Sequence, residues 1–244
     1  MAYTRLVLTG ALFALTSFHA ASEPVQIILS GVWSGADVQV ESGMDWWGLF
    51  PDGDGFKLES APITVTRAFD GMVDSEGEMT GKEVAIPKEA NPLLLARGLN
   101  TLEAGPVVTV KPPGDSWPFL HPGQDCEITL NPADVHNRVF ITALGTAESK
   151  PDSMLIVRRT YELRISKGQG EDPSIQSLAK YPEFTGTHGL RLLWAGDLDR
   201  DGRVDLLYNL STWHMSWHLG LFLSSAAKEG DLVGLVAEWV TTGC

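Results

Sequence analysis

Residues 190–210 read LRLLWAGDLDRDGRVDLLYNL, with an acidic segment between two apolar runs. The runs, Leu190–Ala195 and Val204–Leu210, have the length of buried β-strands and are too short for typical helices. The segment between them is charged and contains a glycine, as turn-forming segments often do. The stretch therefore predicts a strand–loop–strand hairpin over residues 190–210, near the C-terminus.

The loop of this hairpin carries four carboxylates at a regular spacing. They occupy positions one, three, five and nine of the loop: Asp197, Asp199, Asp201 and Asp205. Alternate side chains of a curling loop can point at one centre, and Ca2+ takes about six to eight oxygen ligands. The spacing predicts a calcium site, and the alternative is a solvated acidic turn.

Two further residues of the loop suit the same chemistry. Gly202 lies at position six, where the chain must turn sharply and a side chain would obstruct the turn. Arg203 lies at position seven, from which its main-chain carbonyl would be a ligand. A full EF-hand is not expected, because Tyr208 stands at position twelve in place of a bidentate Glu.

The pattern Asp-x-Asp-x-Asp-Gly-x-x-Asp between two strands resembles the calcium loop of FG-GAP and VCBS repeats, known from integrin-type propellers. The resemblance covers about residues 190–210 and implies that the four Asp residues bind one Ca2+ in a β-hairpin. A propeller is not expected, because it needs several repeats and the chain has one such loop. A looser similarity to secreted bacterial proteins of unknown function involves Pro92–Gly105, Gly196–Leu206 and Leu221–Lys228.

The rest of the chain also favours strands over helices. Short apolar or alternating segments recur between turn signals, and the 25 Gly and 14 Pro are scattered. A hairpin is expected over residues 46–58, a strand at Val38–Glu41 and a helical turn at Ser174–Lys180. The predicted fold is mainly β, an antiparallel sandwich or open barrel over residues 23–244, with a subdivision near residues 112–123 left open.

The first 22 residues have the pattern of a secretory signal peptide. Arg5 precedes the apolar run Leu6–Leu15, and small residues follow at Ala20–Ser22. The alternative is a buried N-terminal strand. We expect a secreted or periplasmic protein, and no later segment is long and apolar enough to span a membrane.

The net charge of −13 disfavours nucleic acid and anionic lipid as partners. It is compatible with the binding of cations. The expected role is that of a secreted, calcium-stabilised protein that acts by binding or as a structural element, with a protein or glycan at the cell surface as its partner. The alternative is an envelope or secreted hydrolase, such as a carbohydrate-active enzyme, with unidentified catalytic residues.

Two other motifs have a catalytic or metal-binding interpretation. His214 and His218 would share one face of a helix, as zinc ligands do, but no third ligand is near in sequence. Ser225 and Lys228 match the Ser-x-x-Lys pattern of serine acyl-enzymes, whose partner motifs are absent. Loop packing and a capped turn are the simpler interpretations.

Eight Trp residues raise the question of a sugar-stacking platform. In a β-sandwich, Trp more often belongs to the core because it buries a large apolar area. The candidates for a platform are Trp46, Trp47, Trp117, Trp213 and Trp217.

The two cysteines, Cys126 and Cys244, are predicted to form a disulfide, because an exported chain meets an oxidising compartment. Thiol titration of denatured, non-reduced protein from the periplasm or medium should therefore find no free thiol. Two titrating thiols would support the alternative of two free cysteines.

Overall fold

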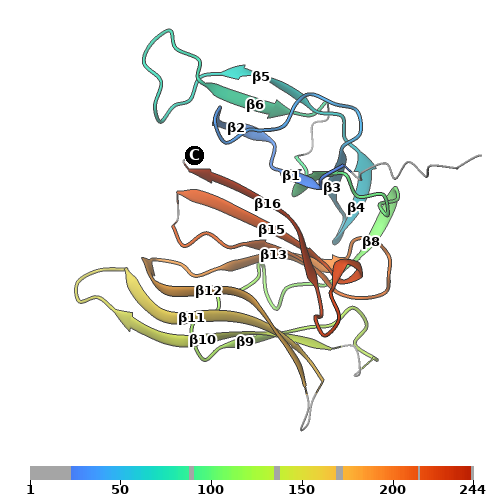
Figure 1. The fold of residues 1–244 in the computed structure, drawn as a ribbon, viewed down its shortest axis with the longest axis vertical. Coiled ribbons are helices and arrows are strands. Elements are labelled where there is room, and N and C mark those ends of the chain that lie inside the picture. Colours follow the sequence, from blue (N-terminus) through green and yellow to red (C-terminus); the bar gives the residue numbers. More distant parts are fainter. Residues whose placement is uncertain (1–22, 88–90, 135–137, 169–172, 214, 243–244) are drawn as a thin grey trace, which may run out of the picture.

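The computed structural model describes residues 23–87, 91–134, 138–168, 173–213 and 215–242, and the regular secondary structure of this part of the chain is almost entirely β-strand (Figure 1). All pairs of named strands are antiparallel, so the predicted fold class is confirmed. The strands are β1 (Gln26–Ile28), β2 (Gly31–Ser34), β3 (Trp47–Asp52), β4 (Gly55–Ser60), β5 (Thr64–Ala68), β6 (Gly81–Ala85), β7 (Leu94–Arg97), β8 (Gly105–Thr109), β9 (Asp125–Ile128), β10 (Val139–Ser149), β11 (Ile156–Lys167), β12 (Ser174–Gly186), β13 (Arg191–Asp197), β14 (Asp205–Asn209), β15 (Ser216–Leu223) and β16 (Gly234–Thr242), with a short 3-10 turn, η2 (Ser224–Ala226).

The strands form three sheets. The largest is a nine-stranded sheet in the order β1-β7-β3-β4-β8-β13-β14-β15-β16. Its two edge strands, β1 and β16, lie against each other, so the sheet is nearly closed and barrel-like. A four-stranded sheet, β12-β11-β10-β9, and a three-stranded sheet, β2-β6-β5, lie on opposite sides of the C-terminal strands (Figure 1).

The C-terminal strands contribute to two hydrophobic cores at once. Leu207, Leu219 and Leu221 point into a core inside the nine-stranded sheet. Leu206 and Tyr208 point to the other face, where they pack against the four-stranded sheet. Strands that are buried on both faces carry continuous apolar runs, which explains the lack of alternation in the sequence of β14. Features of both predicted architectures, an open barrel and a sandwich, are therefore present.

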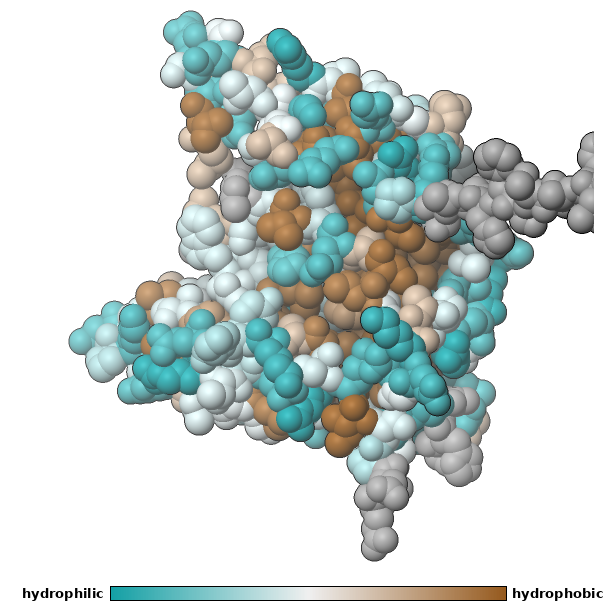
Figure 2. Space-filling view, viewed as in Figure 1, coloured by the Kyte–Doolittle hydropathy of each residue, from teal (hydrophilic) through white to brown (hydrophobic). Residues whose placement is uncertain are grey.

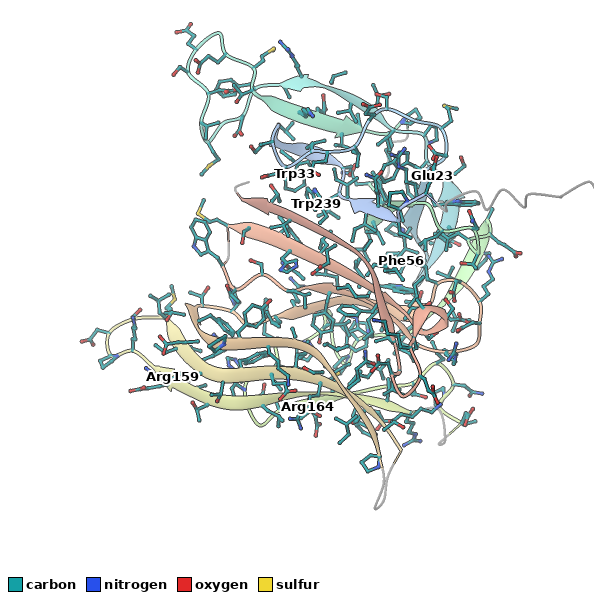
Figure 3. The ribbon with its side chains drawn as sticks, in the orientation of Figure 1. Glu23, Trp33, Phe56, Arg159, Arg164 and Trp239 are labelled. Atoms are coloured by element: carbon teal, nitrogen blue, oxygen red, sulfur yellow. The ribbon has the colours of Figure 1, made fainter. Side chains whose placement is uncertain are left out.

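A tryptophan pair connects the three-stranded sheet to the edge of the nine-stranded sheet. Trp33 of β2 and Trp239 of β16 meet edge to face, with ring centroids 5.0 Å apart (Figure 3). The indole N–H of Trp239 donates to the carbonyl oxygen of Asp37, at 3.1 Å. Such aromatic pairs stabilise packing beyond the area that they bury. This contact helps to place β16 against the N-terminal part of the chain.

The outer face of the four-stranded sheet carries charged side chains in pairs. Arg159 pairs with Glu183 at 2.8 Å, and Arg164 pairs with Glu162 at 2.7 Å (Figure 3). The hydrogen bond from Arg164 lowers the pKa of Glu162 to about 2. Figure 2 shows that apolar residues instead gather in the middle of the molecule, between the two smaller sheets.

The expected hairpin over residues 46–58 is present as β3 and β4, with Gly53 at the turn in a left-handed conformation. Two local expectations are wrong. Ser174–Lys180 is not a helical turn but the first half of β12, because pairing with β11 determines its conformation. Val38–Glu41 belongs to no strand, although Val38 and Val40 are buried and alternate with exposed residues as predicted.

Within the described residues, no helix has the length and apolar character needed to span a membrane. The expected signal peptide, residues 1–22, lies outside the described residues. Residues 112–123 lead from the nine-stranded sheet, after β8, to the four-stranded sheet, before β9.

Because the two cores share β14, replacing a leucine on either face should destabilise the whole fold. Leu206→Ala and Leu207→Ala should each lower the free energy of unfolding by about 2–5 kcal/mol, since both side chains are fully buried. Val240→Ala, at a residue 51% exposed on β16, is the matched control and should change it by less than about 1 kcal/mol. Urea unfolding measures all three. A loss below about 1 kcal/mol for either leucine variant would show that its core does not support the fold.

Candidate metal site

The acidic loop joins β13 to β14, as the sequence predicts. The two strands pair up to Gly196 and Asp205, so the loop closes directly over the end of the ladder. A Cβ atom at Gly196 would lie 2.3 Å from the carbonyl oxygen of Val108 on β8, so only glycine fits there. Gly202 has a φ of +80°, which confirms the sharp turn expected at position six.

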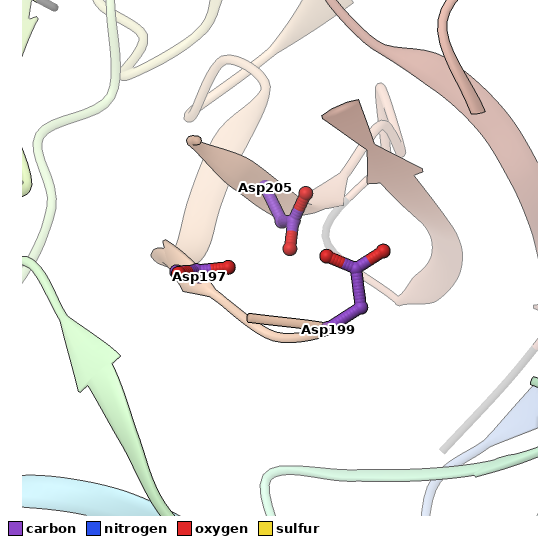
Figure 4. A group of neighbouring side chains, drawn as sticks. All are labelled: Asp197, Asp199 and Asp205. Atoms are coloured by element: carbon purple, nitrogen blue, oxygen red, sulfur yellow. The ribbon is translucent and has the colours of Figure 1, made fainter. Parts of the chain in front are cut away.

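Three of the four loop carboxylates meet at one place. Ligand atoms of Asp197, Asp199 and Asp205 all lie within 4.8 Å of one another, and the three carboxylates face a common centre (Figure 4). Asp205 is completely buried, Asp197 is 7% exposed and Asp199 is half-buried. Two oxygens on opposite sides of a calcium ion are about 5 Å apart, so one cation could contact all three side chains.

Hydrogen bonds hold the carboxylates in this arrangement. Asp205 accepts the backbone N–H of Leu198 at 2.7 Å through one oxygen and that of Ser224 at 2.8 Å through the other. Asp197 accepts the backbone N–H of Gly202 through Oδ2, at 3.0 Å. These bonds fix the side chains before any ligand binds, and each uses only part of the capacity of its carboxylate.

Two carboxylate oxygens in the cluster have no hydrogen-bond partner. Asp197 Oδ1 and Asp199 Oδ1 are both buried, and no described group donates to either. A buried acceptor without a partner costs about 1–3 kcal/mol, and more when it is charged. Since a cation would satisfy both oxygens, the geometry fits a metal site better than a solvated turn.

Burial disfavours the ionised form of these carboxylates when no cation is bound. Loss of solvation raises the pKa of Asp205 to about 7, against the opposing effect of its hydrogen bonds from Ser224 and Leu198. Burial also raises the pKa of Asp197, with smaller contributions from the charges of Asp201 and Asp199. A bound cation would reverse this effect because it stabilises the ionised form.

Asp201 is held differently from the other three. Its carboxylate accepts the hydroxyl of Ser224, at 2.9 and 2.8 Å, and pairs with the guanidinium of Arg203, at 2.7 Å. The structure thus brings together Asp197, Asp199 and Asp205 and places Asp201 beside them. The roles of Asp201 and of the Arg203 carbonyl as ligands stay predictions.

Two serines of the η2 turn complete the site, and the sequence reasoning did not connect them with the loop. Ser224 donates through its backbone to Asp205, and the hydroxyl of Ser225 donates to Asp199. They lie 19 and 26 residues from these partners, so no local pattern shows the contact. Ser225 of the Ser-x-x-Lys pattern therefore supports the acidic loop, which disfavours the acyl-enzyme interpretation. The η2 turn has no side-chain cap at its start, so the structure does not confirm the expected capped turn either.

The other predicted sites have different outcomes. His218 contacts Glu238 at 2.7 Å, whereas His214 lies outside the described residues. Cys126 has a free thiol among the described residues, and burial is the main cause that raises its pKa. Cys244 lies outside the described residues, so the disulfide stays a prediction.

The tryptophans separate into two groups. Trp46 and Trp117 are buried in the cores, where the sequence analysis expected most tryptophans to lie. Trp213 is 54% exposed, and Trp217 is partly buried near it along the rim of one cavity. A single platform that includes Trp46 and Trp117 is therefore excluded, because their faces are covered.

The pKa of Asp205 predicts how metal-free protein responds to pH. Between about pH 4 and pH 7, the folded state holds a proton that the unfolded chain has released. The free energy of unfolding should therefore fall as the pH rises through this window, by up to about 4 kcal/mol. Saturating calcium should abolish the fall, because the cation keeps Asp205 ionised. Urea unfolding at about pH 5 and pH 8, after chelator dialysis and with calcium, measures the difference. If the Asp205→Asn protein shows the same fall as the unmodified chain, or if the unmodified metal-free chain shows no fall, Asp205 does not control the response.

Comparison of the chain with known proteins identifies no relative that carries this site. No protein-family model, no curated protein and no solved structure matches the chain. The resemblance to FG-GAP and VCBS loops therefore depends on the loop residues alone. The structure establishes a β-rich protein with a buried carboxylate group, Asp197, Asp199 and Asp205, that could hold a metal ion.

Proposed function

We propose that the protein is secreted, is stabilised by one Ca2+ in the acidic loop, and acts by binding or as a structural element. The observation that carries the proposal is the pair of buried oxygens without partners, Asp197 Oδ1 and Asp199 Oδ1. Both belong to carboxylates that meet a third, Asp205, around one centre.

The kind of ligand atom favours calcium over transition metals. The converging groups are carboxylates, hard oxygen ligands that suit Ca2+ and Mg2+, with no described His or Cys in the cluster. Calcium tolerates irregular geometry and a larger number of oxygens than magnesium. Asp201 and the carbonyl of Arg203, both within the loop, supply the further ligands that the sequence pattern implies.

The site is structural and not catalytic. Asp205 is completely buried and accepts backbone N–H groups through both oxygens, so a substrate cannot approach it. The neighbouring cavity, of about 90 Å3, is lined by Gly202, Arg203 and Ser224, among others, but by none of the three converging carboxylates. A catalytic metal site needs an open position and access for the substrate.

The effect of the cation would reach beyond the loop itself. Arg200, at the tip, pairs with Glu103 at 2.8 Å and donates to the carbonyl oxygen of Ala104 at 3.0 Å, just before β8. Ser224 and Ser225 attach the loop to the end of β15. The loop thus connects β8, the β13–β14 hairpin and β15, and a cation that orders it stabilises one end of the nine-stranded sheet.

Secretion is supported by the signal-peptide pattern in the sequence of residues 1–22. Extracellular calcium modules often bind in the range of about 10⁻⁴–10⁻³ M, and a buried site of this type suits such a compartment. The proposed partners are a protein or a glycan at the cell surface.

Calcium should raise the melting temperature of the purified mature chain. With a Kd of about 0.1–1 mM, about 10 mM calcium adds roughly 1.4–2.7 kcal/mol of stability. For a chain of this size, that corresponds to roughly 3–10 °C. Asp199→Ala should lower both the melting temperature and the response to calcium, because it removes one ligand and leaves Ser225 without its acceptor. Differential scanning calorimetry in calcium and in EDTA checks both.

Asp54→Ala is the matched control, since Asp54 is an exposed acid that pairs with Lys111 at the surface. This variant should respond to calcium as the unmodified chain does. Equal melting temperatures in EDTA and in calcium would contradict the proposal, as would an equal response to calcium in the Asp199→Ala protein. Magnesium at the same concentration should stabilise less.

A further inference from the structure

A cavity of about 180 Å3 lies at the opposite end of the β13–β14 hairpin from the acidic loop. Arg191, the first residue of β13, faces Asn209, the last residue of β14, across the ladder. Arg191 and Asp197 are six steps apart along β13, which places the two sites roughly 20 Å apart. The cavity is lined by aromatic and polar side chains that include Phe119, His188, Arg191, Asn209, Trp213 and Trp217.

One wall of this cavity is a layered arrangement of flat groups. Phe119 stacks on His188, with ring centroids 4.6 Å apart and an interplanar angle of 17°. The guanidinium of Arg191 lies over the ring of Phe119, 5.4 Å from the ring centroid. Trp213 and Trp217 line the same cavity, and Trp213 is 54% exposed. These surfaces suit the flat face of a ring.

The positive charge of Arg191 is not neutralised within the described structure. None of the described carboxylates forms an ion pair with it, and its buried Nε atom has no hydrogen-bond partner. An arginine with free donors in a partly buried position is a ready partner for a carboxylate, which its planar fork matches.

A second arginine without a carboxylate partner among the described residues lies behind the same wall. Arg158 is completely buried, and the described groups around its guanidinium are neutral: the carbonyl oxygens of Ile156 and Gly186, the imidazole of His121 and the ring of Phe184. Its Nε atom also lacks a hydrogen-bond partner. Gly189 lines the cavity, and a Cβ atom there would lie 3.8 Å from this Nε. Arg158 therefore adds positive charge close to the cavity.

The sign of the charge distinguishes this cavity from others in an acidic protein. No acidic side chain is among the described residues that line it. Acidic side chains line three other cavities: Asp231 lines the first, Glu23 and Asp45 the second, and Asp37 and Glu238 the third. In a chain with a net charge of −13, a cavity that is lined by one arginine without an ion pair and by no described acid is suited to an anion.

We propose that this cavity binds a single ring that bears a carboxylate, with Arg191 pairing with the carboxylate and the tryptophans contacting the ring. Its volume is below the range of about 300–1,000 Å3 that is usual for drug-sized ligands, which limits the occupant to one ring. Sugar acids and aromatic acids share this chemistry. The inference deepens the binding role proposed above and depends on it, but its ligand is recognised away from the calcium loop.

The proposal is tested with four probes on the full mature chain in saturating calcium. The probes are glucuronate and benzoate, which carry a ring and a carboxylate, glucose, which lacks the charge, and acetate, which lacks the ring. Tryptophan fluorescence and isothermal titration calorimetry follow binding. At least one ring acid should bind about tenfold or more tightly than both glucose and acetate, and the better of the two identifies the ligand as a sugar acid or an aromatic acid.

Variants then assign the contacts. Arg191→Gln should weaken binding of the ring acid by about tenfold or more, since a charge-assisted pair is lost. Trp213→Ala, at an exposed position, should weaken it several-fold without unfolding the protein. Arg164→Gln, on the outer face of the four-stranded sheet, is the control and should leave binding unchanged.

Three results would overturn the proposal: no binding of either ring acid, equal binding of glucose, or full binding by the Arg191→Gln protein. If Arg191→Gln does not fold, the comparison of probes on the unmodified chain still decides the question. The melting temperature with and without calcium is measured on the same samples. A calcium response without binding of a ring acid rejects this inference alone, whereas loss of the calcium response rejects the proposed role of the loop.

Discussion

Burial of the strands β13, β14 and β15 on both faces is the constraint on which the rest of the structure depends. One face of these strands packs inside the nine-stranded sheet and the other against the four-stranded sheet. Most residues of these strands are buried, on both faces, so the conformation of the strands depends on packing and on the contacts at their ends. Two cores therefore hold the strands that carry the loop at one end of the hairpin and the cavity at the other. A site on such a rigid support keeps its geometry.

The same burial explains why the acidic loop is unusual electrostatically. Asp205 is the first residue of β14 and is buried together with this strand. Its carboxylate therefore relies for its hydrogen bonds on the backbone N–H groups of Leu198 and Ser224. Asp197 and Asp199 lie beside it, and each has one buried oxygen that accepts no hydrogen bond from a described group. Three ionised carboxylates in so small a volume repel one another, and either a proton or a bound cation relieves the repulsion. The fold thus creates a place that could hold a metal ion.

The opposite end of the hairpin shows the reverse situation. Arg191 and Arg158 lie near one cavity without a carboxylate partner among the described residues, although the chain is strongly acidic. Charges that proteins bury without partners are costly and are retained where a ligand or a mechanism uses them. One hairpin therefore carries uncompensated negative charge at its loop and uncompensated positive charge near its open end, and the two ends suit ligands of opposite sign.

The sequence alone determined the hairpin over residues 190–210, the sharp turn at Gly202 and the β-rich class, because these depend on local spacing and on continuous apolar runs. Only the tertiary structure decided which of the four loop carboxylates converge, since Ser224 and Arg203 hold Asp201 beside the other three. It also placed Ser225 at the loop, formed β12 where a helical turn was expected, and brought Phe119 next to Arg191. Apart from the local Asp201–Arg203 pair and the pairing of β12 with β11, these contacts join residues far apart in the chain, and tertiary packing, which no local pattern encodes, determines them.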